Sequence, residues 1–500
     1  MSKTVIILGG GMGGLFTGAF LSKEGYRVIV LEKNRTIGGG LQCFKRNGTY
    51  FETGMHILGG FTSGGSVNRI CNYLGILDQL KIKDTDIEAI DSITYGEDGA
   101  CYTLPRGKKA FTDYLIHLFP KEENGISQYM DALYAISQEV DLFYLRCSNN
   151  NYLAHSDEFF MPADAFIAKY VSDRKLRDIL AYMSPMYGGI AGHTPTYIHA
   201  LINVLYINGS SQFIDGSQQL ADNLANVIKS NGGDIIVGDA VEYVEIVDRM
   251  VKRVVTKNNL SYTGDWFISD LHPSTLFSLT KDTGFPRHYM NRIKSIPNSY
   301  SAFSVYIKFK PETQPYVNHP RYFQECYGSV WKLSEFNEET FPQGFMYITP
   351  PTINQGFWAN RMIVNCLMSF EPFRKWEHTS VGHRGIDYEQ WKDKLKNKVL
   401  DKLEKIHPGF KSSIDTSFAS TPLTIRDYFG VKEGSLYGHS CDCQNLLLSQ
   451  MPIATKVKNL LLTGQNVNLH GICGVPLTAI ETAEAIVGHG VILDKINNCK

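Results

Sequence analysis

The sequence predicts an α/β protein in which a discontinuous parallel-sheet domain receives an inserted domain of helices plus an antiparallel sheet. An apolar strand, a glycine-rich turn and a helix open the chain within residues 3–40, and strand–helix alternation returns at 213–270. A third strand–loop–helix pattern lies near the C-terminus. Between these parts lie a helix-rich stretch and, from residue 301, strands of alternating polarity that indicate an antiparallel sheet.

The first strand and its glycine-rich turn predict a Rossmann-like dinucleotide site. The apolar run 5–8 is typical of a strand buried on both faces. Gly9, Gly11 and Gly14 follow in G-x-G-x-x-G spacing, which permits a tight turn, a close approach to a pyrophosphate and close helix–strand packing. A second strand then delivers Glu32, whose carboxylate can accept both hydroxyls of an adenosine ribose. The helix N-terminus supplies free N–H groups for the phosphates.

A second glycine cluster favours FAD over NAD as the cofactor. Gly38, Gly39 and Gly40 follow Glu32 closely, and flavoproteins often use such a pair to bring backbone N–H groups against the same diphosphate. The sequence has no second G-x-G-x-x-G in a strand–helix context, so it predicts no dedicated nicotinamide site. NAD(P)H remains open as an external reductant.

The pattern along the chain predicts five consecutive parts. Helices are expected at 109–119, 123–145, 163–170, 175–183 and 475–487, the last with Pro476 near its first turn. Antiparallel strands are expected at 301–310, 344–350 and 361–370. The predicted parts are a first FAD-binding part at 1–80, a helical substrate cap at 81–205, a second FAD-binding part at 206–298, a substrate domain with the antiparallel sheet at 299–420, and a C-terminal FAD-binding part at 421–500.

Composition excludes several classes of protein. A formal net charge of −1 with no long run of one sign gives no indication of nucleic-acid binding. The ten cysteines are scattered and predict neither a disulfide framework nor a metal site. No apolar run reaches the ~18 residues that a membrane span needs, and the first strand begins too early for a cleaved signal peptide. We therefore expect a cytoplasmic protein, with allowance for peripheral contact with the inner face of a membrane.

Three separated segments resemble the phytoene desaturase, carotenoid isomerase and retinol saturase family of FAD-dependent oxidoreductases. They are ILGGGMGGL with LEKNRTIGGGLQCFKRNGTYFETGMHILGG, then HALINVLYINGSSQFIDGSQQLADNLANVIKSNGGDIIVGDAV, and LLLTGQNVNLHGICGVPLTAIETAEAI. Within this family the F-[DE]-T-G-x-H stretch and the C-terminal T-G-Q are most similar to the retinol saturase group. Two positions depart from the family pattern: Gly40 stands where many relatives have an arginine, and Ser217 replaces a common glycine.

The resemblance implies a discontinuous FAD domain, a tunnel that holds a long apolar polyene against the isoalloxazine ring, and contact with a membrane where such substrates reside. It also implies that the loop at Gly464 and the helix after it lie by the flavin. The oligomeric state is left open. The predicted cofactor-binding residues are Gly9, Gly11, Met12, Gly13, Gly14, Glu32, Lys33, Gly39, Gly40, Leu41, Val241, Gly464 and Val475.

His56, in the GMHILGG stretch, is the predicted catalytic candidate. It could give a proton or align the substrate, whereas a core histidine bonded to backbone is the competing interpretation. Tyr187, Tyr437 and His470, each in a glycine-containing loop, are weaker candidates, because among 27 Tyr and 27 Phe a single aromatic residue is more often part of the core than catalytic. Cys473 has no identifiable histidine–acid pair and is not predicted to be a nucleophile.

The function expected from this combination is saturation of a carbon–carbon double bond in a retinoid- or carotenoid-like lipid. Desaturation and isomerisation stay open because all three activities share these motifs. A flavin amine oxidase is a further alternative, although no segment specifies an aromatic cage. A lipid-binding escort protein without redox chemistry is the non-enzyme alternative, and the intact glycine loop with Glu32 argues against it.

Overall fold

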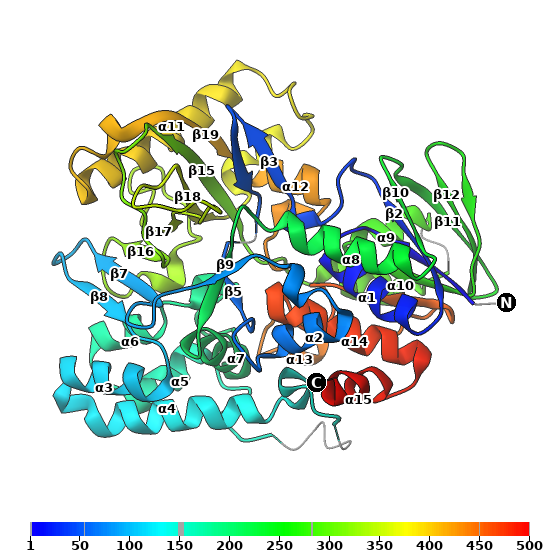
Figure 1. Cartoon of the computed structure of the whole chain (residues 1–500), viewed down its shortest axis with the longest axis horizontal. Coiled ribbons are helices and arrows are strands. Elements are labelled where there is room, and N and C mark those ends of the chain that lie inside the picture. Colours follow the sequence, from blue (N-terminus) through cyan, green and yellow to red (C-terminus); the bar gives the residue numbers. More distant parts are fainter. Residues whose placement is uncertain (1–2, 55, 149–154, 282–283, 450, 500) are drawn as a thin grey trace.

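A computed structural model of the chain describes residues 3–54, 56–148, 155–281, 284–449 and 451–499. It confirms an α/β fold that contains a parallel sheet and a separate, mostly antiparallel one (Figure 1). The parallel sheet has the strand order β10-β2-β1-β14-β20. Its strands are β1 (Thr4–Leu8), β2 (Arg27–Glu32), β10 (Asp234–Val237), β14 (Trp266–Ser269) and β20 (Leu460–Leu462). Strands from three distant parts of the chain therefore build one sheet, as a discontinuous domain requires.

Both faces of the parallel sheet are covered. Val5 and Ile7 of β1 pack into the core that contains α1 (Met12–Lys23), α8 (Gln218–Ser230) and α14 (Gly471–Val487). Ile6 and Leu8 point the other way, because successive strand residues alternate between faces. The layer on this second face consists of β11 (Val241–Val247), β12 (Met250–Thr256), β13 (Ser261–Tyr262), α9 (Pro273–Leu279) and α10 (Arg287–Ser295).

The second large sheet has seven strands in the order β19-β15-β18-β17-β16-β7-β8. Its pairings are antiparallel except that β16 and β7 run parallel. The strands are β7 (Asp91–Tyr95), β8 (Cys101–Leu104), β15 (Ser301–Phe309), β16 (Arg321–Gln324), β17 (Gly344–Ile348), β18 (Arg361–Met368) and β19 (Ile414–Ser420). Helix α11 (Ile386–Ile406) covers one face of this sheet with Leu395, Val399 and Leu403.

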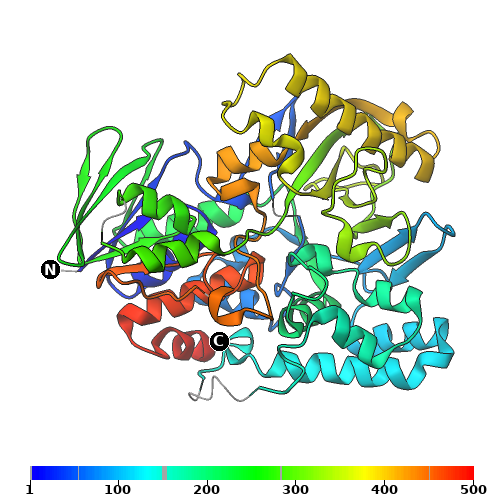
Figure 2. The ribbon, with the colours of Figure 1, turned by 180° about the vertical axis from the view of Figure 1, so that it is seen from behind.

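A group of helices lies on the opposite side of the seven-stranded sheet from α11, as both views show (Figures 1 and 2). These helices are α3 (Lys108–Leu118), α4 (Glu123–Gln138), α5 (Ala163–Tyr170), α6 (Arg174–Leu180) and α7 (Thr196–Ile207). The remaining elements are β3 (Cys43–Arg46), β4 (Thr49–Glu52), β5 (Leu58–Gly59), α2 (Ser66–Leu74), β6 (Ile82–Asp84), β9 (Ser210–Phe213), α12 (Pro422–Phe429), α13 (Leu446–Ser449) and α15 (Val491–Asn498).

Two details differ from the sequence-based expectation. The stretch after residue 81, expected to begin a helical cap, first forms β6, β7 and β8, because two short strands joined by the turn at 96–100 complete the edge of the seven-stranded sheet. Helix α14 begins at Gly471, so Pro476 lies inside it and not in its first turn. No helix within the described ranges is both long and apolar enough to cross a bilayer. The five-part division of the chain remains a prediction.

Candidate functional site

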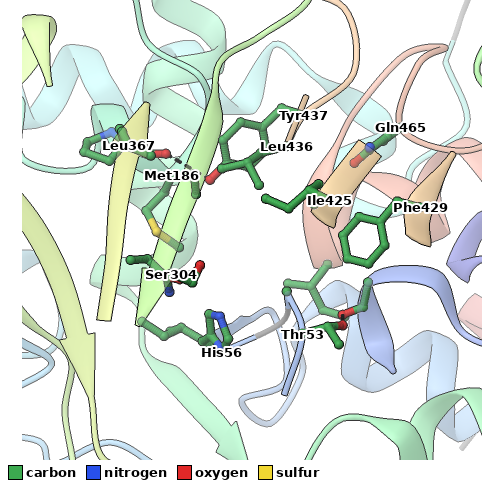
Figure 3. A pocket seen from close by; sticks show the side chains of 18 of the residues that line it. Thr53, His56, Met186, Ser304, Leu367, Ile425, Phe429, Leu436, Tyr437 and Gln465 are labelled. Atoms are coloured by element: carbon green, nitrogen blue, oxygen red, sulfur yellow. Dashed lines mark hydrogen bonds between the residues drawn. The ribbon is translucent and has the colours of Figure 1, made fainter. Parts of the chain in front are cut away.

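A cavity of about 270 Å³ lies where the parallel-sheet domain meets the seven-stranded sheet. The glycine loops after β1 and β2 and the N-terminal half of α14 line one part of it. The seven-stranded sheet and the segment before Tyr187 line the rest. Figure 3 shows Ser304 and Leu367 reaching it from the sheet, and Ile425, Phe429 and Leu436 from the segment around α12. The cavity therefore joins the predicted cofactor loops to the predicted substrate domain.

The glycine loops pack too closely for side chains. A Cβ on Gly14 would lie 2.2 Å from the carbonyl oxygen of Gly9, and one on Gly13 would lie 2.6 Å from the Cα of Gly464. The second cluster joins the first directly, because the N–H of Gly38 donates to the carbonyl oxygen of Gly10 at 2.7 Å. Backbone N–H groups of both clusters are thereby gathered at the N-terminus of α1, where an anion is stabilised.

Glu32 ends β2 and is 7% exposed. Its two carboxylate oxygens accept N–H groups from Gly10 and Asn34, each at 2.8 Å. These bonds fix the carboxylate beside the glycine turn, and each oxygen retains a lone pair for a further donor. The position matches that of an acceptor for ribose hydroxyls.

The predicted cofactor residues separate into three sets in the structure. Gly9, Gly14, Glu32 and Gly464 build or border the loops. Lys33 and Val241 lie outside the cavity lining: the Lys33 ammonium donates to the carbonyl oxygen of Asp427 at 2.9 Å, and Val241 begins β11 in the small sheet. The predicted residues that line the cavity are Gly11, Met12, Gly13, Gly39, Gly40, Leu41 and Val475.

These residues fit a dinucleotide cofactor. The closely packed glycines form a cradle that a Cβ would fill, and Glu32 provides a buried acceptor. Asn466, which lines the cavity two residues after Gly464, has a buried side-chain oxygen without a hydrogen-bond partner in the described part of the chain. Unpaired buried polar atoms of this kind are costly unless a ligand or water satisfies them.

Asp270 is an acid that sequence reasoning missed. It follows β14 and lines the cavity, and its carboxylate accepts N–H groups from Gly11 and Gly14. Enclosure by protein raises the pKa of Asp270 to about 7, and the two N–H groups oppose this shift. A carboxyl group whose charge changes near neutral pH therefore lies beside the predicted diphosphate site. The sequence contained a signal for Asp270, because it directly follows a strand of the parallel sheet and ligands bind outside the carboxyl ends of such strands.

The sheet side of the cavity consists of two rows of side chains. Strand register aligns Ser304, Asn365, Met346 and Tyr322 across β15, β18, β17 and β16. In the next row Ala302 pairs with Leu367 and Gly344 pairs with Gln324. All eight residues line the cavity. The Leu333 side chain lies against Gly344 in this second row.

His56 follows β4 and lines the cavity. Its Nδ1 lies 3.3 Å from Oε2 of Glu52, and both side chains are buried. This contact is with a carboxylate, whereas the competing interpretation expected a hydrogen bond to the backbone. With Nδ1 directed at a carboxylate, Nε2 is the ring nitrogen left for a ligand. Figure 3 shows the His56 ring below Ser304 at the edge of the cavity.

The structure brings together three of the weaker candidates that lie apart in the sequence: Tyr187, Tyr437 and His470. All three line a second, small cavity of about 10 Å³, and Tyr437 also lines the large one. The rings of Tyr437 and His470 are 5.0 Å apart. The Tyr187 hydroxyl bonds to Nδ1 of His199 at 2.9 Å, and burial lowers the pKa of His199 to about 3, so this histidine is a neutral structural group.

Cys473 is a buried, protonated thiol. The Cys473 thiol is buried against the Ser66 hydroxyl at 3.2 Å, and burial raises its pKa to about 11, which leaves it protonated. Within the described ranges no group of three or more histidine, cysteine or acidic side chains is placed to bind a metal ion.

Comparison with known proteins adds evidence from outside the structure. A family model described as an NAD(P)-binding Rossmann-like domain matches residues 7–74. All-trans-retinol 13,14-reductase of Rattus norvegicus is 25% identical over 536 residues, covering 98% of this chain and 86% of the relative. The similarity to the all-trans-retinol 13,14-reductases extends over 98% of this chain for the rat protein and 99% for that of Danio rerio. A prolycopene isomerase of an Oncidium hybrid cultivar is 22% identical over 451 residues, covering 87% of this chain and 74% of the relative.

The fold is also similar to that of solved structures. A solved oxidoreductase from Methanosarcina mazei superposes with a TM-score of 0.67 at 15% identity, covering 96% of this chain and 100% of the other.

The polar residues of the sheet that line the cavity lay outside every motif that sequence reasoning used. They are Ser304, Asn365, Tyr322 and Gln324. Their alternation within β15 and β16 was visible, but which face meets the cavity depends on the helices that cover the sheet.

Proposed function

We propose that this protein is an FAD-dependent oxidoreductase that saturates a carbon–carbon double bond of a lipophilic polyene, retinoid- or carotenoid-like in class. The observation that supports it most is the single cavity shared by the glycine cradle and the seven-stranded sheet. Full-length similarity to retinol 13,14-reductases supports the substrate class and the direction. The apolar lining from Ile425, Phe429 and Leu436 suits a hydrocarbon chain.

The cradle suits FAD more than a nicotinamide cofactor because two glycine clusters, not one, converge on the N-terminus of α1. Backbone N–H groups of Gly13 and Gly39 would hold the diphosphate, and Glu32 would accept the ribose hydroxyls. Asn466 and the N-terminal half of α14 would lie by the ring. When bound, the flavin supplies the hydride for a double-bond reduction.

His56 is proposed as the proton source for the second carbon. Its Nδ1 lies 3.3 Å from Oε2 of Glu52, which orients the ring. Burial lowers the pKa of the Arg361 guanidinium, and the carboxylates of Glu52 and Asp215 oppose this shift. Nε2 is then the atom that can give a proton toward the cavity.

We also propose peripheral contact with a membrane. Ile353, Phe357 and Trp358, in the loop between β17 and β18, are 58%, 69% and 40% exposed. Two aromatic rings and an aliphatic side chain on one loop are suited to insertion at a lipid surface. The loop is held in place, because the N–H of Tyr316 donates to the carbonyl oxygen of Phe357 at 2.8 Å. A lipophilic substrate could enter from such a surface.

The proposed function is tested with anaerobically reduced, flavin-loaded protein. Mixing it with all-trans-retinol should return the flavin absorbance as the polyene takes up the electrons. An isomerase would leave the flavin reduced while the ligand changes its isomer. A desaturase would instead bleach oxidised flavin. Protein that purifies without flavin and cannot be loaded would contradict the proposal and favour the escort alternative.

A further inference from the structure

The large cavity crosses the seven-stranded sheet from the cofactor loops to β16. A Cβ on Gly40 would lie 3.9 Å from the ring of Phe429, and that ring packs against the buried cluster that contains Ala302 of β15. The cofactor loops therefore meet the sheet at β15. Strand order places β16 three strand spacings away, roughly 14 Å at the usual distance between neighbouring strands. The next strands, β7 and β8, are described in full and contribute no lining residue, so the cavity ends at β16.

Leu333 forms the wall at this end. It lies in the connection between β16 and β17, and of residues 325–343, all of which the structure describes, it alone lines the cavity. A Cβ on Gly344 would lie 2.7 Å from Cδ2 of Leu333, so the Leu333 side chain occupies the space that Gly344 leaves. Lys332 and Glu335 beside it are exposed, which places Leu333 between the cavity and the surface.

The backbone on both sides of Leu333 is fixed to the walls of the cavity. The Ser184 hydroxyl donates to the carbonyl oxygen of Val330 at 3.4 Å, which ties the segment to the helical side. The N–H of Ser369, directly after β18, donates to the carbonyl oxygen of Ser334 at 3.1 Å. A wall held from two sides limits the length of a ligand, because it does not swing aside. Leu333 carries only apolar atoms, so it selects by size.

We propose that Leu333 sets the longest polyene that the cavity accepts. This inference rests on the proposed function and adds a length limit to it. A polyene whose far end reaches Leu333 is enclosed along its whole length. A longer one must either displace the fixed wall, which strains the packing, or leave part of its apolar surface in water. Because Leu333 lies outside both hydrophobic cores that the described residues form on the two faces of the sheet, its replacement should leave the fold intact.

The test measures binding of a series of all-trans polyenes with identical end groups, from retinoid to carotenoid length, to flavin-loaded, oxidised protein, so that no double bond is reduced. Quenching of the protein fluorescence reports the affinity. In wild type the affinity should rise with length, because more apolar surface is buried, and then fall at a limit. Leu333→Ala should move this limit to a longer polyene, which then binds about tenfold more tightly than to wild type. Leu333→Trp should move the limit to a shorter one.

Leu436→Ala is the matched control, because Leu436 is a leucine of the same cavity that packs beside Ala302 at the cofactor end. It should weaken the binding of every polyene alike and leave the length limit where it is in wild type. A wild-type series without a limit, a limit that stays unchanged in both Leu333 variants, or one that moves equally in Leu436→Ala would overturn this inference alone. Failure of polyenes of every length to bind would instead overturn the proposed function. The wild-type series needs no variant to fold.

Discussion

At the scale of single residues, Asp270 couples the cofactor site to pH. Its pKa of about 7 in the folded protein is above the ordinary value of 3.8, so the folded state binds an extra proton between about pH 4 and pH 7. The free energy of unfolding therefore falls as pH rises through this window. Above pH 7 the full cost of the buried charge remains.

Asp270→Asn removes this titration. Its free energy of unfolding relative to wild type should increase from pH 4 to pH 8 by up to about 4 kcal/mol, from the shift of about three pH units. Urea unfolding of flavin-free protein at several pH values measures the difference. Asp157→Asn, at an exposed position, is the control and should follow wild type throughout. Parallel pH curves for wild type and Asp270→Asn would contradict the assignment.

His56 gives a second residue-scale prediction. His56→Gln keeps a side-chain donor for Glu52 but cannot give a proton as an acid. We expect product formation to slow by about 10²–10⁴-fold with flavin content unchanged, the usual contribution of a positioned acid. Rapid-reaction kinetics with reduced protein measure the rate, and the exposed His117→Gln serves as control. An unchanged rate in His56→Gln would assign the proton to water or to another group.

At the scale of elements, local sequence predicted the parallel-sheet domain well. Strand β1 contains the apolar run expected at 5–8, and β2 ends at Glu32 as expected, because apolar strands, glycine spacing and the acid at Glu32 all act locally. The small strands β7 and β8 were missed. Strand β7 pairs with β16, which is more than 200 residues away in the chain, and β8 pairs with β7, so no local signal encodes the partner that holds them.

The candidate site, too, has one part that local sequence predicts and one part that it does not. The glycine cradle follows from a motif in which each residue has its own steric reason. The sheet side of the cavity does not follow from a motif. Tyr322 and Gln324 line the cavity because of the register across β15, β18, β17 and β16 and because helices close the other side. Long-range pairing of this kind cannot be derived from period-two alternation alone.

The cradle itself yields an element-scale prediction. Gly13→Ala places a Cβ 2.4 Å from Oδ1 of Asp270 and 2.6 Å from the Cα of Gly464, so Asp270 and the loop after β20 must move away from α1. Flavin retained per chain after gel filtration should fall at least about tenfold. Gly356→Ala, where a Cβ meets nothing within 4 Å, is the control and should retain flavin fully. Normal flavin content in Gly13→Ala would show that the cofactor does not rest on this contact.

At the scale of the whole molecule, two domains share one cavity, and the exposed loop between β17 and β18 extends from the sheet that lines it. If this loop contacts membranes, the double variant Phe357→Ser with Trp358→Ser should lose most of its association with phosphatidylcholine vesicles in a flotation assay. Leu260→Ser, half exposed on the nucleotide-binding side, should not change flotation. Equal flotation of both variants would place the contact elsewhere, and no flotation of wild type would exclude it.

The central claim is that electrons pass from a flavin in the glycine cradle to a double bond held over the seven-stranded sheet. The most direct test is the mass of the product after a single anaerobic turnover of stoichiometrically reduced protein with all-trans-retinol. The account predicts one product per flavin, heavier than the substrate by two hydrogens. A product of unchanged mass, or one lighter by two hydrogens and formed only by oxidised protein, would contradict it.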